Sequence, residues 1–134
     1  MSLFGIDLVP VRRVARILDR PYGESFLDRL FSESEREWLV GLGEAERILE
    51  VASGYAIKEA VIKASAGMLA LDFLREISIR RGTRGPMSTA RKALWGECVF
   101  MVSACHDAES VYAVASCVET VPPLPSSISP ERSQ

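Results

Sequence analysis

The chain has 134 residues, of which 48% are hydrophobic, and its formal net charge is −2. This length predicts one domain around a single core, and the near-neutral charge excludes an overall basic field that would bind nucleic acid or an anionic membrane surface. No apolar stretch reaches the ~18 residues of a membrane-spanning helix. The three cysteines lack a CxxC pair and accompany a single histidine, so we expect reduced thiols and a cytoplasmic location rather than a zinc site or disulfides.

The first third of the chain predicts a strand followed by short helices. Apolar residues alternate with Gly and Asp over Leu3–Val9, which is typical of a strand, and an apolar stripe over Val11–Leu18 indicates a helix. After a break at a proline and a glycine, a second short helix should end near Phe31. The run Ser32–Glu35 has the pattern of a capping box, which predicts a further helix through Leu39.

The middle of the chain predicts one long helix and the start of a sheet. The helix should run from about residue 44 to residue 68. Glu76–Arg80 alternates as a strand does, and Gly82–Pro86 has the composition of a turn. We expect Met87–Trp95 to hold a short helix.

The last part of the chain predicts a hairpin and a tail. Cys98–Val102 and Val111–Val118 should be paired strands around a polar loop, Ser103–Ser110. The proline- and serine-rich residues 121–134 should be disordered, which leaves a single domain over residues 1–120. Together these elements predict an α+β fold in which helices, one of them long, pack on a small antiparallel sheet.

A cluster of charges interrupts the predicted long helix. Lys58, Glu59 and Lys63 are the only charged residues between Glu50 and Asp72. In a helix, Glu59 and Lys63 lie four residues apart on one face, while Lys58 points about 100° away. An ordinary surface ion pair is the common alternative for this spacing. Because the flanking residues are apolar, however, we favour charges that are desolvated and need a partner or a ligand.

Two further polar residues lie beside apolar runs. Asp7 interrupts the first predicted strand, and His106, the only histidine, follows a later one. Taken alone, Asp7 is more often a hydrogen-bonded structural acid, and His106 a loop histidine. Taken with the helix, they indicate one assembled site in which Asp7 and Glu59 converge on Mg²⁺, while the lysines and the histidine meet phosphate oxygens.

The order and spacing of these residues match a known pattern. Four motifs follow one another along the chain: Phe4-Gly-Ile-Asp-Leu-Val9, Tyr55-Ala-Ile-Lys-Glu-Ala-Val-Ile-Lys-Ala64, Arg84-Gly-Pro86, and Ser103-Ala-Cys-His-Asp107 with Tyr112-Ala-Val-Ala115. Over roughly residues 3–118 the chain resembles the holo-acyl-carrier-protein synthase family of 4′-phosphopantetheinyl transferases. The mid-chain motif is the most specific of the four.

The resemblance implies transfer of 4′-phosphopantetheine from coenzyme A to a serine of an acyl or peptidyl carrier protein, with Mg²⁺ and release of 3′,5′-ADP. Asp7 and Glu59 match the family's metal-binding acids, and either is a candidate to help deprotonate the serine. Lys63 matches the catalytic lysine near the pyrophosphate, while Lys58 and His106 match positions that contact coenzyme A phosphates. Phosphoryl transfer depends on charge neutralisation and positioning, which suits these residue types. The resemblance also implies a homotrimer with sites between subunits.

Three arginines of the first predicted helix form a candidate docking surface. Arg13, Arg16 and Arg20 are spaced i, i+3 and i+7, so they should share a face. In the family this helix docks the acidic carrier protein, and Arg13 and Arg20 fall at expected docking positions. A solvated helix face without a partner is an equally good interpretation.

The sequence departs from the family pattern near the coenzyme A positions. The usual Gly-Arg-Phe is Ser53-Gly-Tyr55, the usual Gly-Thr-Gly is Ala66-Gly-Met68, Pro10 replaces a glutamate, and Cys105 replaces a serine. Losing an arginine and a hydroxyl should weaken coenzyme A binding. We therefore expect a transferase of altered specificity, for example one that serves a polyketide or peptide synthase. The alternative is a family-derived protein that binds a carrier or its pantetheine arm without transferring it, or that catalyses another reaction.

Overall fold

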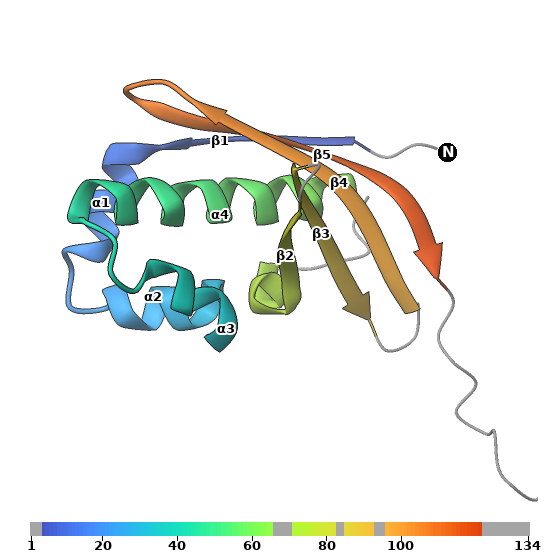
Figure 1. Ribbon diagram of the computed structural model, residues 1–134, viewed down its shortest axis with the longest axis horizontal. Coiled ribbons are helices and arrows are strands. Elements are labelled where there is room, and N and C mark those ends of the chain that lie inside the picture. Colours follow the sequence, from blue (N-terminus) through green and yellow to red (C-terminus); the bar gives the residue numbers. More distant parts are fainter. Residues whose placement is uncertain (1–3, 66–70, 83–84, 93–95, 122–134) are drawn as a thin grey trace, which may run out of the picture.

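The computed structural model describes residues 4–65, 71–82, 85–92 and 96–121, which form helices packed on one side of a five-stranded antiparallel sheet (Figure 1). The strand order is β1-β5-β4-β3-β2. The strands are β1 Phe4–Pro10, β2 Ile77–Gly82, β3 Gly85–Lys92, β4 Gly96–His106 and β5 Ser110–Val121. The helices are α1 Val11–Leu18, α2 Gly23–Leu30, α3 Glu33–Arg36 and α4 Glu44–Ala64, with 3-10 turns at Glu37–Leu39 (η1) and Leu71–Glu76 (η2). The predicted α+β architecture is confirmed.

The capping box at the start of α3 is present. The Ser32 hydroxyl accepts from the backbone N–H of Glu35 at 3.3 Å, and the Glu35 carboxylate accepts from the backbone N–H of Ser32 at 2.9 Å. These two bonds satisfy amides that have no partner within the helix. They also fix the Glu35 side chain against the body of the protein, where it is buried.

Two predictions of local structure are wrong. The helix predicted over Met87–Trp95 is absent from its described part, because residues up to Lys92 belong to β3, which pairs with both β2 and β4; residues 93–95 lie outside the described residues. A short segment without a clear period takes its conformation from such neighbours. The loop predicted over Ser103–Ser110 is also too long, since β4 continues through His106. The Asp107 carboxylate closes the tight turn by accepting from the backbone N–H groups of Glu109 and Ser110 at 2.8 and 2.9 Å.

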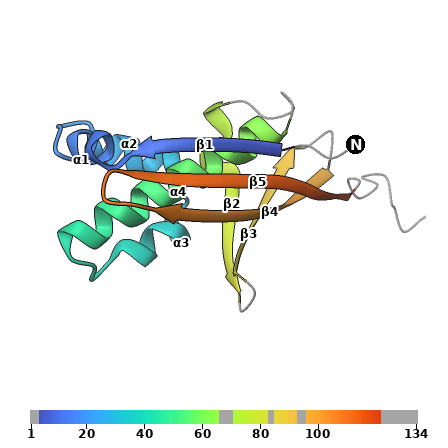
Figure 2. The ribbon, with the colours of Figure 1, turned by 90° about the horizontal axis from the view of Figure 1, so that it is seen from above.

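Two other predictions fall partly outside the described residues. The long helix is confirmed from Glu44 to Ala64, but residues 66–68 lie beyond the description. In the predicted tail, Val121 is the last residue of β5, and residues 122–134 lie outside the described part of the chain. In Figure 2, β1, β5 and β4 run side by side across the molecule.

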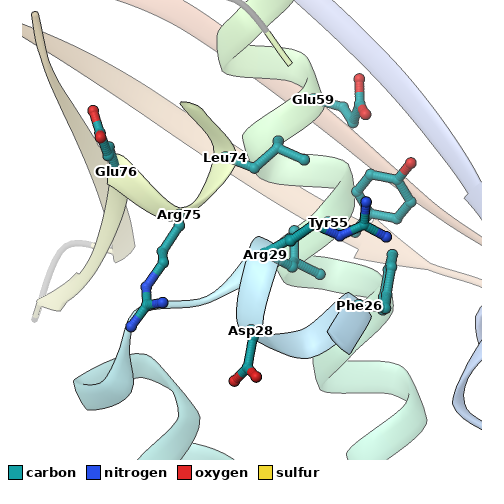
Figure 3. Close-up of a pocket in the computed structure, with 9 residues that line it drawn as sticks. Phe26, Asp28, Arg29, Tyr55, Glu59, Leu74, Arg75 and Glu76 are labelled. Carbon is teal, nitrogen blue, oxygen red and sulfur yellow. The ribbon is translucent and has the colours of Figure 1, made fainter. Parts of the chain in front are cut away.

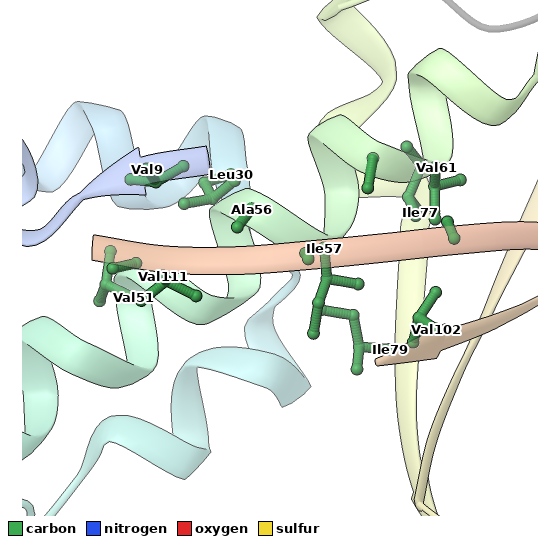
Figure 4. Packing of buried hydrophobic residues seen from close by; sticks show 14 of the residues in the cluster. Val9, Leu30, Val51, Ala56, Ile57, Val61, Ile77, Ile79, Val102 and Val111 are labelled. Carbon is green, nitrogen blue, oxygen red and sulfur yellow. The ribbon is translucent and has the colours of Figure 1, made fainter. Parts of the chain in front are cut away.

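The core lies between α4 and the sheet (Figure 4). Val51, Ala56 and Val61 of α4 are fully buried against strand residues such as Val111. Burial of each such valine stabilises the fold by roughly 1.5–3 kcal/mol. The contact of α4 with β1 is unusually close: a Cβ added to Gly5 would lie 1.9 Å from the backbone oxygen of Ala60. A glycine is therefore what lets β1 lie directly on α4.

The strand β1 turns its small and polar residues inward and its large apolar residues outward. Gly5 and Val9 are buried, whereas Phe4 and Ile6 remain 64% and 69% exposed. Neighbouring strands add further exposed apolar side chains to the same side. We call this the outer sheet face, which comprises Phe4, Ile6, Leu8, Met101, Tyr112, Val114 and Val118. Within the described residues, no helix combines the length and apolar character needed to cross a membrane.

Candidate active site

Two acids and a lysine meet where β1 lies on α4. The Lys63 ammonium donates to Asp7 Oδ1 at 2.7 Å and to the backbone oxygen of Ile6 at 3.2 Å. Glu59 lies one helical turn before Lys63, close enough to Asp7 for the two carboxylates to interact electrostatically. We call Asp7, Glu59 and Lys63 the acid–lysine cluster. The structure thus brings together three of the residues singled out in the sequence.

Repulsion and burial shape the electrostatics of this cluster. Burial and the charge of Asp7 raise the pKa of the Glu59 carboxyl, and a hydrogen bond with the Tyr55 hydroxyl opposes this rise, as do the charges of Lys63 and Arg13. The hydrogen bond to Asp7 raises the pKa of Lys63, so this lysine stays charged. The cluster therefore concentrates negative charge that Lys63 only partly offsets.

The donor set of the cluster fits a hard divalent cation. Mg²⁺ is commonly held by one or two carboxylates, with waters and substrate phosphates completing its shell. Asp7 and Glu59 supply two such carboxylates at the protein surface. No group of three or more His, Cys, Asp or Glu side chains is placed to hold a metal within the part of the chain that the structure describes.

Lys58 is not available for the predicted contact with coenzyme A phosphates. Its side chain is fully buried, and its ammonium donates to Glu35 Oε1 and to the Leu30 backbone oxygen, each at 2.7 Å. It also lies 5.1 Å from the centre of the Phe31 ring. Burial lowers the pKa of Lys58, and the charge of Glu35 opposes that effect. Lys63 therefore reaches Asp7 on β1, whereas Lys58 points to another side of α4, toward Leu30 and Glu35.

His106 does not join the acid–lysine cluster within one chain. It is exposed at the end of β4, where it pairs with Val111, which in turn pairs with Val9 of β1. Two strand spacings, roughly 10 Å, therefore separate His106 from β1. Its Nδ1 lies 3.4 Å from the backbone oxygen of Asp107, the neighbouring residue.

The arginines of α1 surround a shallow basic groove. Arg13 and Arg16 line it together with Arg12, opposite the turn between β4 and β5, and the groove has a volume of about 650 Å³. Arg13 also lies near enough to Glu59 and Tyr55 to affect their pKa values. Arg20 falls in the turn after α1, which ends at Leu18, so the i+7 spacing does not place it on the helix face.

A second groove, which the sequence did not indicate, has Glu59 among its lining residues (Figure 3). Its volume is about 720 Å³, and it lies between α2, α4 and η2. Phe26 and Tyr55 form its apolar wall, with ring centres 5.6 Å apart and ring planes at 77°. We call it the Phe26–Tyr55 groove; its other lining residues are Asp28, Arg29, Leu30, Glu59, Leu74, Arg75 and Glu76.

Gly54, which stands where the family pattern has an arginine, faces the core. A Cβ added to Gly54 would lie 2.5 Å from the Phe31 ring, the same ring that covers Lys58. A side chain at residue 54 therefore requires Phe31 to move. The aromatic ring occupies the space that a larger residue would need.

The raised pKa of Glu59 predicts a specific pH dependence of stability. Because the folded carboxyl binds its proton more tightly than the unfolded one, whose ordinary pKa is 4.5, the metal-free fold should lose stability as the pH rises above that value. Glu59→Gln should remove this loss and raise the melting temperature at about pH 7 in the presence of a chelator. Thermal unfolding from about pH 4.5 to about pH 7, with exposed Glu76→Gln as control, measures it. Parallel profiles for wild type and Glu59→Gln would contradict the expectation.

The chain is similar in sequence to known proteins. Residues 3–115 match the model of the 4′-phosphopantetheinyl transferase superfamily. A holo-[acyl-carrier-protein] synthase from Chlamydia trachomatis is 32% identical over 115 residues, which cover 83% of this chain and 94% of that protein. One from Chlorobium phaeovibrioides is also 32% identical, with coverage of 83% and 90%.

Solved structures show the same likeness. A holo-(acyl-carrier-protein) synthase from Bacillus anthracis in complex with CoA (3′,5′-ADP) superimposes with a TM-score of 0.71 at 25% identity, covering 86% of this chain and 94% of that one. The Helicobacter pylori synthase in complex with coenzyme A gives 0.67 at 26% identity, with coverage of 87% and 100%. The chain therefore belongs to the 4′-phosphopantetheinyl transferase superfamily, among its holo-[acyl-carrier-protein] synthases.

Proposed function

We propose that this chain transfers 4′-phosphopantetheine from coenzyme A to a serine of an acyl or peptidyl carrier protein, in a Mg²⁺-dependent reaction that releases 3′,5′-ADP. The observation that carries the proposal is the convergence of Asp7, Glu59 and Lys63 where β1 lies on α4. Similarity to synthases solved with coenzyme A supports the choice of co-substrate.

Each member of the cluster has a role that its placement suits. Asp7 and Glu59 would hold Mg²⁺, which when bound supplies charge neutralisation to the phosphate oxygens. Either acid is also a candidate to help take the proton of the attacking serine. Lys63 is charged and half exposed, so its ammonium can stabilise the negative charge that builds on the leaving phosphate. This last interaction should support turnover more than ground-state binding.

The working form of the enzyme is, in this proposal, a homotrimer that joins at the outer sheet face. Contiguous exposed apolar residues of this kind mark interaction surfaces. Such an assembly would also explain why His106 is remote from the cluster of its own chain: it can serve the site of a neighbouring subunit. Val114→Glu should convert the trimer into monomers in sedimentation velocity. A wild-type monomer at micromolar concentration would contradict the proposal.

Intact mass spectrometry tests the transfer itself. The protein is incubated with coenzyme A, Mg²⁺ and a panel of apo carriers, and a carrier should gain the mass of one phosphopantetheine group. Asp7→Asn should abolish the gain without loss of fold, whereas Asp19→Asn, an exposed acid at the end of α1, should not. A carrier that binds but keeps its mass would favour the alternative of a carrier-binding protein without transferase activity.

The panel should include carriers of polyketide and peptide synthases. Departures from the family pattern at Gly54 and Cys105 support an altered specificity of this kind. The three cysteines are thiols, which fits the reducing cytoplasm that we propose as its location.

Carrier docking on α1 can be tested separately from the chemistry. Arg13→Glu combined with Arg16→Glu, the two predicted docking arginines that line the groove on α1, should raise the KM for the carrier with a smaller effect on coenzyme A binding. The family resemblance implies an acidic carrier. The effect on KM should therefore shrink at high salt, which screens the long-range attraction between carrier and arginines. Arg80→Glu, an exposed arginine on β2, is the matched control. An unchanged carrier KM at low salt would show that the α1 arginines are merely solvated.

A further inference from the structure

The ammonium of Lys63 occupies one of the two proposed metal ligands. It lies 2.7 Å from Asp7 Oδ1, within the range of a strong charge-assisted hydrogen bond. The Asp7 side chain is only 14% exposed, so water screens this bond less than it would screen a bond at the open surface. A second bond, to the backbone oxygen of Ile6, holds the same ammonium on β1.

Lys63 and a divalent cation compete for the same Asp7 carboxylate. The proposed function requires Asp7 for Mg²⁺ and the Lys63 ammonium for a phosphate of coenzyme A. In the free protein the two are bonded to each other instead. A divalent cation on Asp7 and an ammonium on the same carboxylate would repel, because like charges at such short range interact strongly outside bulk water. Filling the site therefore needs the ion pair to open.

The position of Lys63 makes opening easy. Its side chain is 52% exposed, and it has a flexible four-carbon stem that can move its ammonium without repacking the core. Lys58 offers the contrast on the same helix, since it is fully buried and bonded to both Leu30 and Glu35.

We propose that Lys63 is an exchangeable counter-ion of the active site. In the free enzyme its ammonium neutralises Asp7 and stabilises the paired acids; when cation and coenzyme A enter together, it leaves Asp7 for the substrate phosphate. The inference rests on the proposed function, since it takes Asp7 and Glu59 as the metal acids. Its consequence is that the free protein binds a divalent cation weakly, and that coenzyme A and the cation strengthen each other's binding, as linkage requires.

Metal affinity without substrate tests this exchange. Mn²⁺ serves as the probe, and its binding to the coenzyme A-free protein is measured by electron paramagnetic resonance. Lys63→Met keeps most of the stem and removes the charge, so it should bind Mn²⁺ about fivefold more tightly than wild type, the change expected for the loss of one competing ion pair. Lys63→Arg keeps a competitor and should stay close to wild type. Arg80→Met, which removes an exposed charge on β2, controls for net charge.

A second readout measures the coupling. In wild type, coenzyme A should raise Mn²⁺ affinity, and in Lys63→Met this enhancement should shrink because the released ammonium is no longer there to bind the phosphate. Equal or weaker Mn²⁺ binding by Lys63→Met, in a folded sample, would overturn the inference. Asp7→Asn distinguishes a failure of the proposed metal site from a failure of the counter-ion exchange. If it leaves Mn²⁺ binding intact, the proposed metal site fails; if it weakens binding while Lys63→Met has no effect, the counter-ion exchange alone fails.

Discussion

Lys58→Met should be among the most destabilising single substitutions in this protein. It removes the cation from a buried pair and leaves the Glu35 carboxylate, which is 3% exposed, without a counter-charge. Breaking a buried ion pair in this way costs about 3–5 kcal/mol, a large part of a typical domain's stability. Urea denaturation should show the loss as a lower midpoint with an unchanged slope.

The matched control lies five residues further along the same helix. Lys63→Met makes the same chemical change at a half-exposed position, where an ion pair contributes at most about 1 kcal/mol. Removing both buried charges with Lys58→Met and Glu35→Gln should recover part of the stability lost in Lys58→Met alone, because no uncompensated charge remains. Similar losses for Lys58→Met and Lys63→Met would mean that Lys58 is not buried in solution.

This pair also shows what the sequence could and could not predict. Helical spacing separates Lys58 from Glu59 by about 100°, and the structure does place Lys58 apart from Glu59 and Lys63. It could not tell which direction led into the core, because Glu35 and Phe31, which receive the Lys58 side chain, lie more than 20 residues earlier. The capping box was evident, but one Glu35 oxygen also accepts from the Ile79 backbone at 3.1 Å, a link to β2 that no local pattern contains.

The position of His106 could not be predicted from the sequence either, because it depends on the length of β4. The family resemblance associated it with phosphate, and its position in the fold depends on where the turn between β4 and β5 begins. A loop of eight residues was expected from polar composition, yet Ser103 and Cys105 simply occupy the exposed side of β4. Alternation of exposed and buried residues is typical of a strand with one solvated face, so a polar run alone did not distinguish the two.

Asp7 and Glu59 come together because of a residue with no side chain. From the sequence, Gly5 was expected only to share a strand face with Asp7. The alternating pattern did not indicate that the α4 backbone at Ala60 and Ala64 would lie against this face. In the structure that face lies on α4 so closely that only a hydrogen fits. The acid–lysine cluster is therefore set by the distance between β1 and α4, a tertiary quantity.

Gly5→Ala should damage both the fold and the reaction. The new methyl carbon would lie 1.9 Å from the backbone oxygen of Ala60 and 2.6 Å from the backbone nitrogen of Ala64, so β1 must move away from α4. Overpacking of this kind costs about 1–3 kcal/mol, and backbone atoms leave little room for relief, so we expect the upper end of that range. A shift of about 1 Å between Asp7 and Glu59 should also lower turnover about a hundredfold in molecules that stay folded.

Gly43→Ala is the matched control, since a Cβ there would meet nothing within 4 Å. It should leave turnover unchanged and cost less stability than Gly5→Ala, although Gly43 is the N-cap of α4, where alanine is less favourable than glycine. Thermal unfolding gives the stability of each variant, and carrier modification followed by intact mass gives its rate. A Gly5→Ala protein as stable and as active as Gly43→Ala would mean that β1 lies further from α4 in solution.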